Sequence, residues 1–219
     1  MNPQISKSIV TAALYKEFVA IGFVKRSQGF MTRDVGHEIL GGVSFNCVSY
    51  RREDAVEVNV MVGVRHAELQ KVVAKYKMTP YKDYEPMTFG EHLGYLMPEK
   101  SYLPYIFQGS ASIEHRSRDV IIAFQRYGMP FMKANSTLEA ICSYLENEHE
   151  TKRLIAGPDP YSYHMAAAYA LLGKKEAALA FLERKLAECA EGISLADQEF
   201  REFAARLSEH LVSGGITPS

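Results

Sequence analysis

Tryptophan is absent from this sequence of 219 residues, and cysteine occurs only three times, at Cys47, Cys142 and Cys189. Widely spaced cysteines in apolar surroundings argue against a disulfide framework or a zinc ribbon, and they favour a reducing compartment. The sequence also lacks a signal-peptide pattern and any apolar run close to the roughly 20 residues that cross a membrane. We therefore expect a cytoplasmic protein without a membrane partner.

Positive charge is not in excess either, because the formal net charge is −1. Proteins that bind nucleic acids or anionic membranes non-specifically rely on clustered positive charge. We therefore expect no nucleic-acid partner.

Catalytic motifs with recognisable spacing are missing as well. The sequence contains no Gly-x-Gly-x-x-Gly, phosphate loop, His-Glu-x-x-His or Gly-x-Ser-x-Gly pattern, and no two of its seven histidines lie three or four residues apart. A cluster of Arg33, Asp34, His37 and Glu38 places a carboxylate beside a histidine, but a solvated turn explains it with fewer assumptions. Cys47 has apolar neighbours that favour a buried, unreactive thiol. We predict no catalytic residue, metal site or cofactor, and we lean away from an enzyme.

What the sequence does contain is a hairpin pattern between His37 and His66. Two apolar runs, Val43–Tyr50 and Ala55–Val64, flank a polar tetrad at residues 51–54. Valine occupies every even position from 56 to 64, which predicts a strand with one buried face. Glu57 and Asn59 lie on the odd face, which either meets solvent or lines a cleft, and we favour solvent.

The rest of the chain predicts helices around this hairpin. Helical spacing covers residues 5–21, 67–76, 112–127, 136–148, 161–172, 175–189 and the region after 194, while short strands are expected within 23–33 and 87–97. Gly128 should end one helix, and Ser136 with Glu139 matches a capping box. The prediction is an α+β fold, with an antiparallel meander sheet of about three to five strands packed by helices. A C-terminal helical hairpin and one further helix follow, so we expect an α+β domain over 1–155 and a helical extension over 156–219.

Two resemblances follow from this layout. The first rests on Leu14, Gly22-Phe23 with Lys25, Phe30, the hairpin, Gly94-Tyr95 with Pro98, and Gly128-Met129-Pro130-Phe131 before a capped helix. Over roughly the first two-thirds, the chain resembles a family of uncharacterised bacterial α+β domains that open with a helix ending in a Gly-Phe-x-Lys step. The resemblance implies an architecture and no catalytic residues. Some proteins of this kind occur in toxin-immunity settings, which implies a protein partner.

The second resemblance covers Ser162–Lys185. Tyr169, Gly173, Ala178 and Leu182 resemble the spacing of a single tetratricopeptide-type hairpin. Ser162 and Lys185 depart from that pattern, which favours a large aromatic residue and alanine there. Because about three repeats are needed for a free-standing array, we expect this hairpin to pack on its neighbours as a cap.

The candidate binding surface is the irregular segment Tyr76–Phe107, which contains four prolines. Tyrosine offers rigid contact area with a polar tip, and proline lowers the cost of ordering a loop. The candidate binding residues are Tyr81, Tyr84, Tyr95, Tyr102 and Tyr105, together with Glu57 and Asn59 of the strand. An equally good reading is that the aromatic residues fasten a long connection to the core.

Three hypotheses remain open. The leading one is a non-enzymatic protein-binding module, immunity-like or regulatory. The alternative is a small-molecule-binding protein or an enzyme of unrecognised type, with a cleft between sheet and helices lined by Glu57, Asn59 and His92. The third is a homodimer that forms through the C-terminal helices.

Overall fold

The computed structural model describes residues 5–36, 38–151, 160–189 and 194–214. Its contacts divide the chain into two compact units. Unit 1 comprises Met1–Arg65 and Phe89–Ala134, and unit 2 comprises His66–Thr88 and Asn135–Ser219. The chain therefore enters unit 2, returns to unit 1 and enters unit 2 again. The expected division into an α+β domain over 1–155 and a helical extension over 156–219 stays a prediction.

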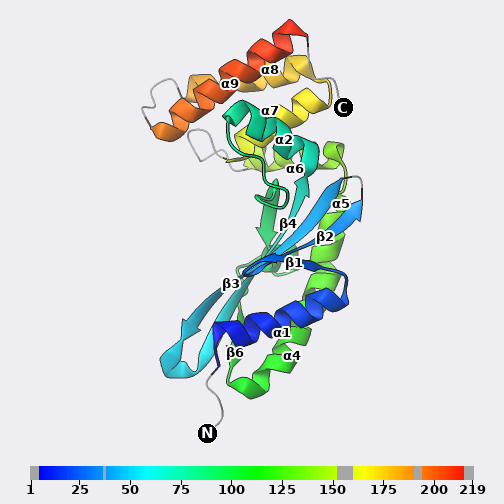
Figure 1. The fold of residues 1–219 in the computed structure, drawn as a ribbon, viewed down its shortest axis with the longest axis vertical. Helices are drawn as coiled ribbons and strands as arrows, with labels where there is room; N and C mark the ends of the chain where they lie inside the picture. Colours follow the sequence, from blue (N-terminus) through cyan, green and yellow to red (C-terminus); the bar gives the residue numbers. More distant parts are fainter. Residues whose placement is uncertain (1–4, 37, 152–159, 190–193, 215–219) are drawn as a thin grey trace. The chain divides into compact units, whose positions relative to one another are not determined.

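Unit 1 combines a sheet with helices. Its elements are α1 (Lys7–Ala20), β1 (Val24–Ser27), β2 (Phe30–Gly36), β3 (Ile39–Tyr50), η1 (Arg51–Glu53), β4 (Ala55–His66), β5 (Phe89–His92), α3 (Leu93–Leu96), β6 (Tyr105–Gln108), η2 (Ser110–Ser112), α4 (Ile113–Ala123), η3 (Phe124–Gly128) and α5 (Met129–Ala134). In Figure 1, α1 in blue and α4 in green lie side by side against the sheet, in agreement with their mutual contacts. The α+β class expected from the sequence is confirmed.

Strand β4 organises the sheet. In the described residues the sheet has six strands in the order β1-β2-β3-β4-β5, and β6 also pairs with β4. The antiparallel register places Val64 opposite Phe89 and Met61 opposite His92 in β5, whereas Val58 lies opposite Tyr105 in β6. Strands β5 and β6 therefore follow each other along β4, and β3 is its other neighbour.

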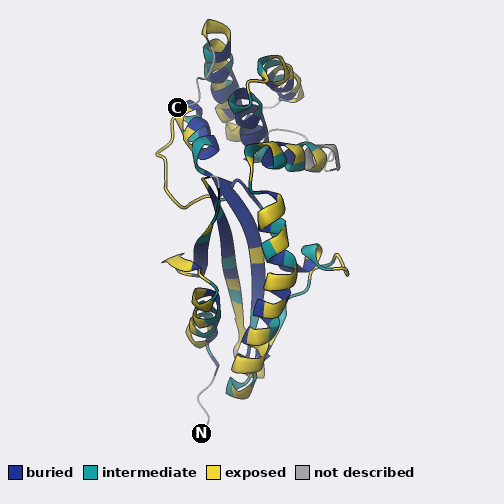
Figure 2. Ribbon diagram, turned by 90° about the vertical axis from the view of Figure 1, so that its right-hand side faces the viewer, coloured by how far each residue is buried: buried dark blue, intermediate teal, exposed yellow. Residues whose placement is uncertain are grey.

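The valine face of β4 forms the core of unit 1. Val56, Val58, Val60, Val62 and Val64 are all 0% exposed. The Phe18 ring packs edge-on against the rings of Phe23, Phe45 and Phe124, at centroid distances of 5.5, 5.1 and 4.7 Å. Figure 2 shows the long strands mostly in the buried colour, with exposed residues on the outward sides of the helices. The predicted buried face of the strand is confirmed.

The polar cluster before β3 has structural partners. Arg33 donates from Nη1 to the Ile21 carbonyl oxygen at 2.7 Å, which satisfies a group that the end of α1 leaves unpaired. Asp34 accepts from the Gly36 amide at 2.7 Å, as in an Asx turn. His37 lies outside the described residues. These contacts favour the turn interpretation over an acid–base pair.

Gly128 does not end its helix, so that prediction is wrong. The five residues Phe124–Gly128 form a π-helical turn, and α5 continues from Met129. Pro130 is tolerated because it lies in the first turn of α5, where an amide hydrogen is dispensable. A Cβ at position 128 would lie 2.7 Å from a Phe124 ring carbon, so this glycine is needed for close packing.

Three further expectations need correction. The strand expected within 87–97 covers only Phe89–His92, because Gly94 and Tyr95 belong to the short helix α3. Strand β6 appears inside the segment that looked irregular in sequence. The cap of α6 is Thr137, one residue later than expected, and its hydroxyl accepts from the Ala140 amide at 3.1 Å.

Unit 2 is helical. Its helices are α2 (Ala67–Lys77), α6 (Leu138–Thr151), α7 (Pro160–Leu171), α8 (Lys175–Glu188) and α9 (Leu195–Ser213). The hairpin of α7 and α8 turns at Gly173, whose φ is +69°, and buries Ala166, Ala167, Ala168 and Ala178 at 0% exposure. Ser194 and Asp197 form a capping box at the start of α9. The predicted C-terminal hairpin and further helix are confirmed, whereas the linker at 156–158 and Asp159 lie outside the described residues.

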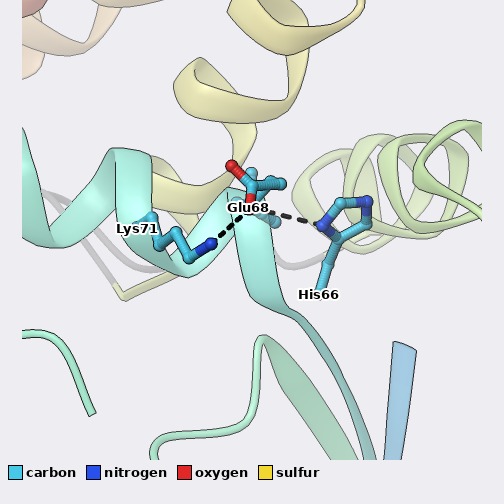
Figure 3. Close-up of polar contacts among 4 residues, drawn as sticks. His66, Glu68 and Lys71 are labelled. Atoms are coloured by element: carbon cyan, nitrogen blue, oxygen red, sulfur yellow. Dashed lines mark hydrogen bonds and ion pairs between the residues drawn. The ribbon is translucent and has the colours of Figure 1, made fainter. Parts of the chain in front are cut away.

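Polar contacts join the start of α2 to its surroundings within unit 2. Figure 3 shows His66 before the first turn, where its Nδ1 accepts from the Leu69 amide at 3.3 Å, and the pair of Glu68 with Lys71. Deeper inside, the Gln70 amide donates to the Thr88 hydroxyl at 3.1 Å and lies 2.9 Å from the His164 ring. This buried network links α2 to α7 and to the segment that returns to the sheet.

Candidate functional site

The odd face of β4 carries a cluster of polar and aromatic side chains within unit 1. Glu57, Asn59 and Met61 alternate with the buried valines, and residues directly opposite in an antiparallel pair share a face. Ile106 lies opposite Glu57, and His92 lies opposite Met61. These residues therefore occupy the side of the sheet that the valine core does not use.

Glu57 is the centre of this cluster. Its Oε1 accepts from the Asn59 amide and from the Tyr102 hydroxyl, each at 3.1 Å, and its Oε2 accepts from the Tyr50 hydroxyl at 3.1 Å. The hydrogen bond from Asn59, with those from Tyr102 and Tyr50, holds the pKa of Glu57 below its usual value against the opposing effect of desolvation. Glu57 is therefore a carboxylate at neutral pH.

Asn59 has only half of its side chain satisfied. It is 8% exposed, and its Nδ2 donates to Glu57. Its Oδ1 is buried and has no hydrogen-bond partner among the described residues. The reverse orientation would point the amide oxygen at the carboxylate, so the chemistry of Glu57 fixes Oδ1 as an acceptor that faces away.

His92 offers a buried donor, where Asn59 offers a buried acceptor. It is 6% exposed, and its Nδ1 accepts from the Gly94 amide at 3.2 Å. Burial lowers the pKa of His92, so the ring is neutral at pH 7 and the hydrogen lies on Nε2. This Nε2–H is a buried donor without a partner in the described part of the chain.

The segment from α3 to β6 places two tyrosines beside these groups. The Tyr102 ring lies 4.8 Å from the His92 ring with 33° between their planes, and the Tyr95 ring lies 6.0 Å away, edge-on. Gly94 makes this path possible, because a Cβ there would lie 2.9 Å from the Leu103 amide nitrogen. Burial raises the pKa of Tyr102, and its hydrogen bond to Glu57 raises it further. Its hydroxyl thus stays protonated as a donor.

Large apolar groups lie on the same face as the carboxylate, from Tyr50 at one end to Met61 at the other. Tyr50, Met61, Tyr95, Tyr102 and Ile106 are between 38% and 52% exposed. We call this set, together with Glu57, Asn59 and His92, the tyrosine face. Isolated exposed apolar residues are ordinary, but a group of them around a fixed charge is typical of a binding surface.

The structure brings four of the seven candidate binding residues together: Glu57, Asn59, Tyr95 and Tyr102. Tyr105 lies opposite Val58 and therefore on the helix-covered side, where burial, with the nearby negative charges of Asp119 and Glu99, raises its pKa to about 12. Tyr81 and Tyr84 belong to unit 2 and are 37% and 39% exposed.

Sequence reasoning missed three members of the tyrosine face. Met61 follows Glu57 and Asn59 in the alternation of β4, so the same pattern could have included it. Tyr50 ends the first apolar run, next to the turn. Ile106 gave no signal, because β6 was not recognised as a strand. His92 was named only as a cleft residue.

Other types of site find less support. No group of three or more His, Cys, Asp and Glu in the described residues is placed to hold a metal ion. Burial raises the pKa of all three cysteines, to about 11 for Cys142, which disfavours the thiolate form that a nucleophile needs. Of the helices described, none is long and apolar enough to cross a membrane.

Comparisons of the chain with protein-family models, with curated proteins and with solved structures found no match. A proposal of function therefore rests mainly on the geometry of the tyrosine face.

Proposed function

We propose that this chain is a non-enzymatic binding module that holds another protein through the tyrosine face of unit 1. The single observation behind the proposal is the set of five exposed apolar side chains that share the tyrosine face with the Glu57 carboxylate, two of which bind it. Tyrosine and methionine are enriched in protein interfaces. Tyrosine offers a large contact area at a low entropic cost of ordering, and methionine adapts its shape to the surface that it meets.

The hydrogen bonds of the tyrosine face favour this role. Tyr50 and Tyr102 are each tied to Glu57 by a hydroxyl, which reduces the freedom that they would lose on binding. Tyr50, whose hydroxyl binds the Oε2 atom of Glu57, is therefore already in place when a partner arrives. The resemblance to bacterial domains found in toxin-immunity settings fits a partner of this kind, and the three free cysteines fit action in the cytoplasm.

A capture experiment with matched variants tests the proposal. The immobilised wild-type chain is incubated with lysate of its source organism beside Tyr95→Ser/Tyr102→Ser and Tyr81→Ser/Tyr84→Ser. The second variant is the control, because it removes two tyrosines of similar exposure from unit 2. We expect one protein to be enriched by the wild type and the control, and at least about tenfold less by the first variant.

Equal capture by both variants, or no enriched protein at all, would contradict the proposal. Circular dichroism must show that both variants are folded. Light scattering of the purified chain shows whether it forms a dimer. If it does, and if only Tyr95→Ser/Tyr102→Ser dissociates that dimer, the partner is a second copy of this chain. The dimer interface is then the tyrosine face and not the C-terminal helices.

A further inference from the structure

We propose that the segment bound at the tyrosine face presents an arginine, whose guanidinium is shared between Glu57 and the Asn59 Oδ1 while a backbone carbonyl of that segment accepts from the His92 Nε2–H. This inference rests on the proposed function and names the chemistry of the partner. It is carried by one carboxylate and two buried polar atoms, for which the described part of the chain supplies neither a cation nor a hydrogen-bond partner.

The charge of the site calls for a cation. The three donors to Glu57 are the neutral groups of Tyr50, Asn59 and Tyr102. None of the ion pairs formed by the described residues includes Glu57. Glu53 adds negative charge close to Tyr50. A partner that brings a positive group therefore gains a charge-assisted hydrogen bond that the free chain lacks.

The arrangement of acceptors favours arginine over lysine. Asn59 follows Glu57 by two residues on the same face of β4, and its Nδ2 lies between Oδ1 and the carboxylate, so the site presents two acceptors that are set apart. A planar guanidinium carries five N–H donors in a fixed fork and stacks on aromatic rings, whereas an ammonium is a compact and strongly hydrated charge. The ring of Tyr95 borders the same site, so it offers a stacking surface.

The donor on His92 favours a peptide over a free cation. A guanidinium has no acceptor, so it leaves the Nε2–H of His92 unsatisfied. Asn59 and His92 are diagonal neighbours across β4 and β5, because His92 lies opposite Met61. Such neighbours are roughly 7–8 Å apart, which an arginine side chain spans between its backbone carbonyl and its guanidinium. Buried polar atoms that lack a partner are rare in native structures, so one ligand that satisfies both is economical.

Tyr102 lies beside both side chains that carry the buried atoms. Its ring is 52% exposed and packs on His92, and its hydroxyl is held by Glu57. A guanidinium that binds Glu57 competes with this hydroxyl, and the ring then turns outward and uncovers Asn59. The half-exposed ring needs no change in the core to do so.

Nuclear magnetic resonance titrations with small probes test the inference. The probes are N-acetyl-arginine methylamide, the lysine equivalent and the citrulline equivalent, which keeps the shape of arginine but has no charge. We expect saturable shifts at the Asn59 amide group, the His92 ring and Tyr102 with the arginine probe, at least about fivefold weaker binding of the lysine probe, and no saturable shift with citrulline. Equal binding of citrulline, or of lysine, would overturn the proposal, as would shifts that map elsewhere.

Two variants complete the test. Glu57→Gln keeps the size of the side chain and removes its charge, so it should weaken the arginine probe at least about tenfold. Glu114→Gln on α4 is the matched control, since it removes an exposed carboxylate elsewhere in unit 1, and it should leave binding unchanged. If protein capture is lost with Tyr95→Ser/Tyr102→Ser but kept with Glu57→Gln, the arginine is wrong and the binding module stands. If capture is independent of both variants, the proposed function itself fails.

Discussion

The two faces of strand β4 show how one strand serves two purposes. The even positions from 56 to 64 are valines at 0% exposure, and they stabilise unit 1 by burial. The odd positions alternate a hydrogen-bonded carboxylate, a half-satisfied amide and an exposed methionine. The first face is arranged for stability. Within the residues that the structure describes, the second leaves buried polar atoms unpaired, which lowers stability and is typical of sites that meet a ligand.

Two opposite substitutions, apolar to polar at Val58 and polar to apolar at Asn59, test this comparison of the two faces. The largest effect is expected for Val58→Asn on the valine face. The change removes a fully buried apolar side chain and places an amide where no partner is available, so unfolding should become easier by about 3–5 kcal/mol. Amide hydrogen exchange in β4 reports this directly, and it reads unit 1 separately from unit 2.

Ser44→Asn is a fair control for Val58→Asn, because it introduces the same side chain at a half-buried position of β3. Its cost should stay within about 1 kcal/mol. Equal exchange protection in the two variants would show that the valine face does not dominate the stability of unit 1.

The opposite substitution, Asn59→Leu, should have a smaller effect of opposite sign. The leucine keeps a similar size, removes the unpartnered Oδ1 and loses one hydrogen bond to Glu57. Because an unsatisfied buried acceptor costs about 1–3 kcal/mol and a hydrogen bond returns about 1 kcal/mol, the variant should be as stable as the wild type or up to about 1 kcal/mol more stable. Urea unfolding measures the difference. A loss above about 2 kcal/mol would mean that Asn59 supports the fold.

Local pattern was enough to predict much of unit 1. The period of two in residues 55–64, the helical spacing of residues 5–21 and the short strands within 23–33 all depend on neighbours in sequence. These patterns became β4, α1 and the pair of β1 and β2. The C-terminal hairpin was predictable for the same reason. Residues 112–134 were harder, because the π-helical turn depends on how Gly128 packs on Phe124.

The candidate site was only partly predictable. Glu57 and Asn59 could be placed on one face, since alternation along a strand is local. Which tyrosines join them depends on how residues 93–104 pass beside β4, and that path is set by the contact of Gly94 with the Leu103 backbone. The separation of Tyr105 from Tyr102 depends on the register of β6, which no local pattern gives.

The smallest predicted effect concerns acid. Burial lowers the pKa of His92 in the folded chain below its ordinary 6.5, so the unfolded chain takes up this proton first as the pH falls. The stability contributed by the neutral ring is therefore present above about pH 6.5 and declines below it. Between pH 7.5 and 5.5, the melting temperature of the wild type should fall by about 2 °C more than that of His92→Gln.

The acid titration should stop at pH 5, because the lowered pKa of Glu57 removes stability only below its ordinary value of 4.5. His115→Gln provides the control for the loss of a histidine, since it removes an exposed side chain of α4. That variant should keep the acid sensitivity of the wild type. If His92→Gln also keeps the acid sensitivity of the wild type, the Nε2–H of His92 is satisfied in solution. The tyrosine face then offers no free donor to a partner carbonyl.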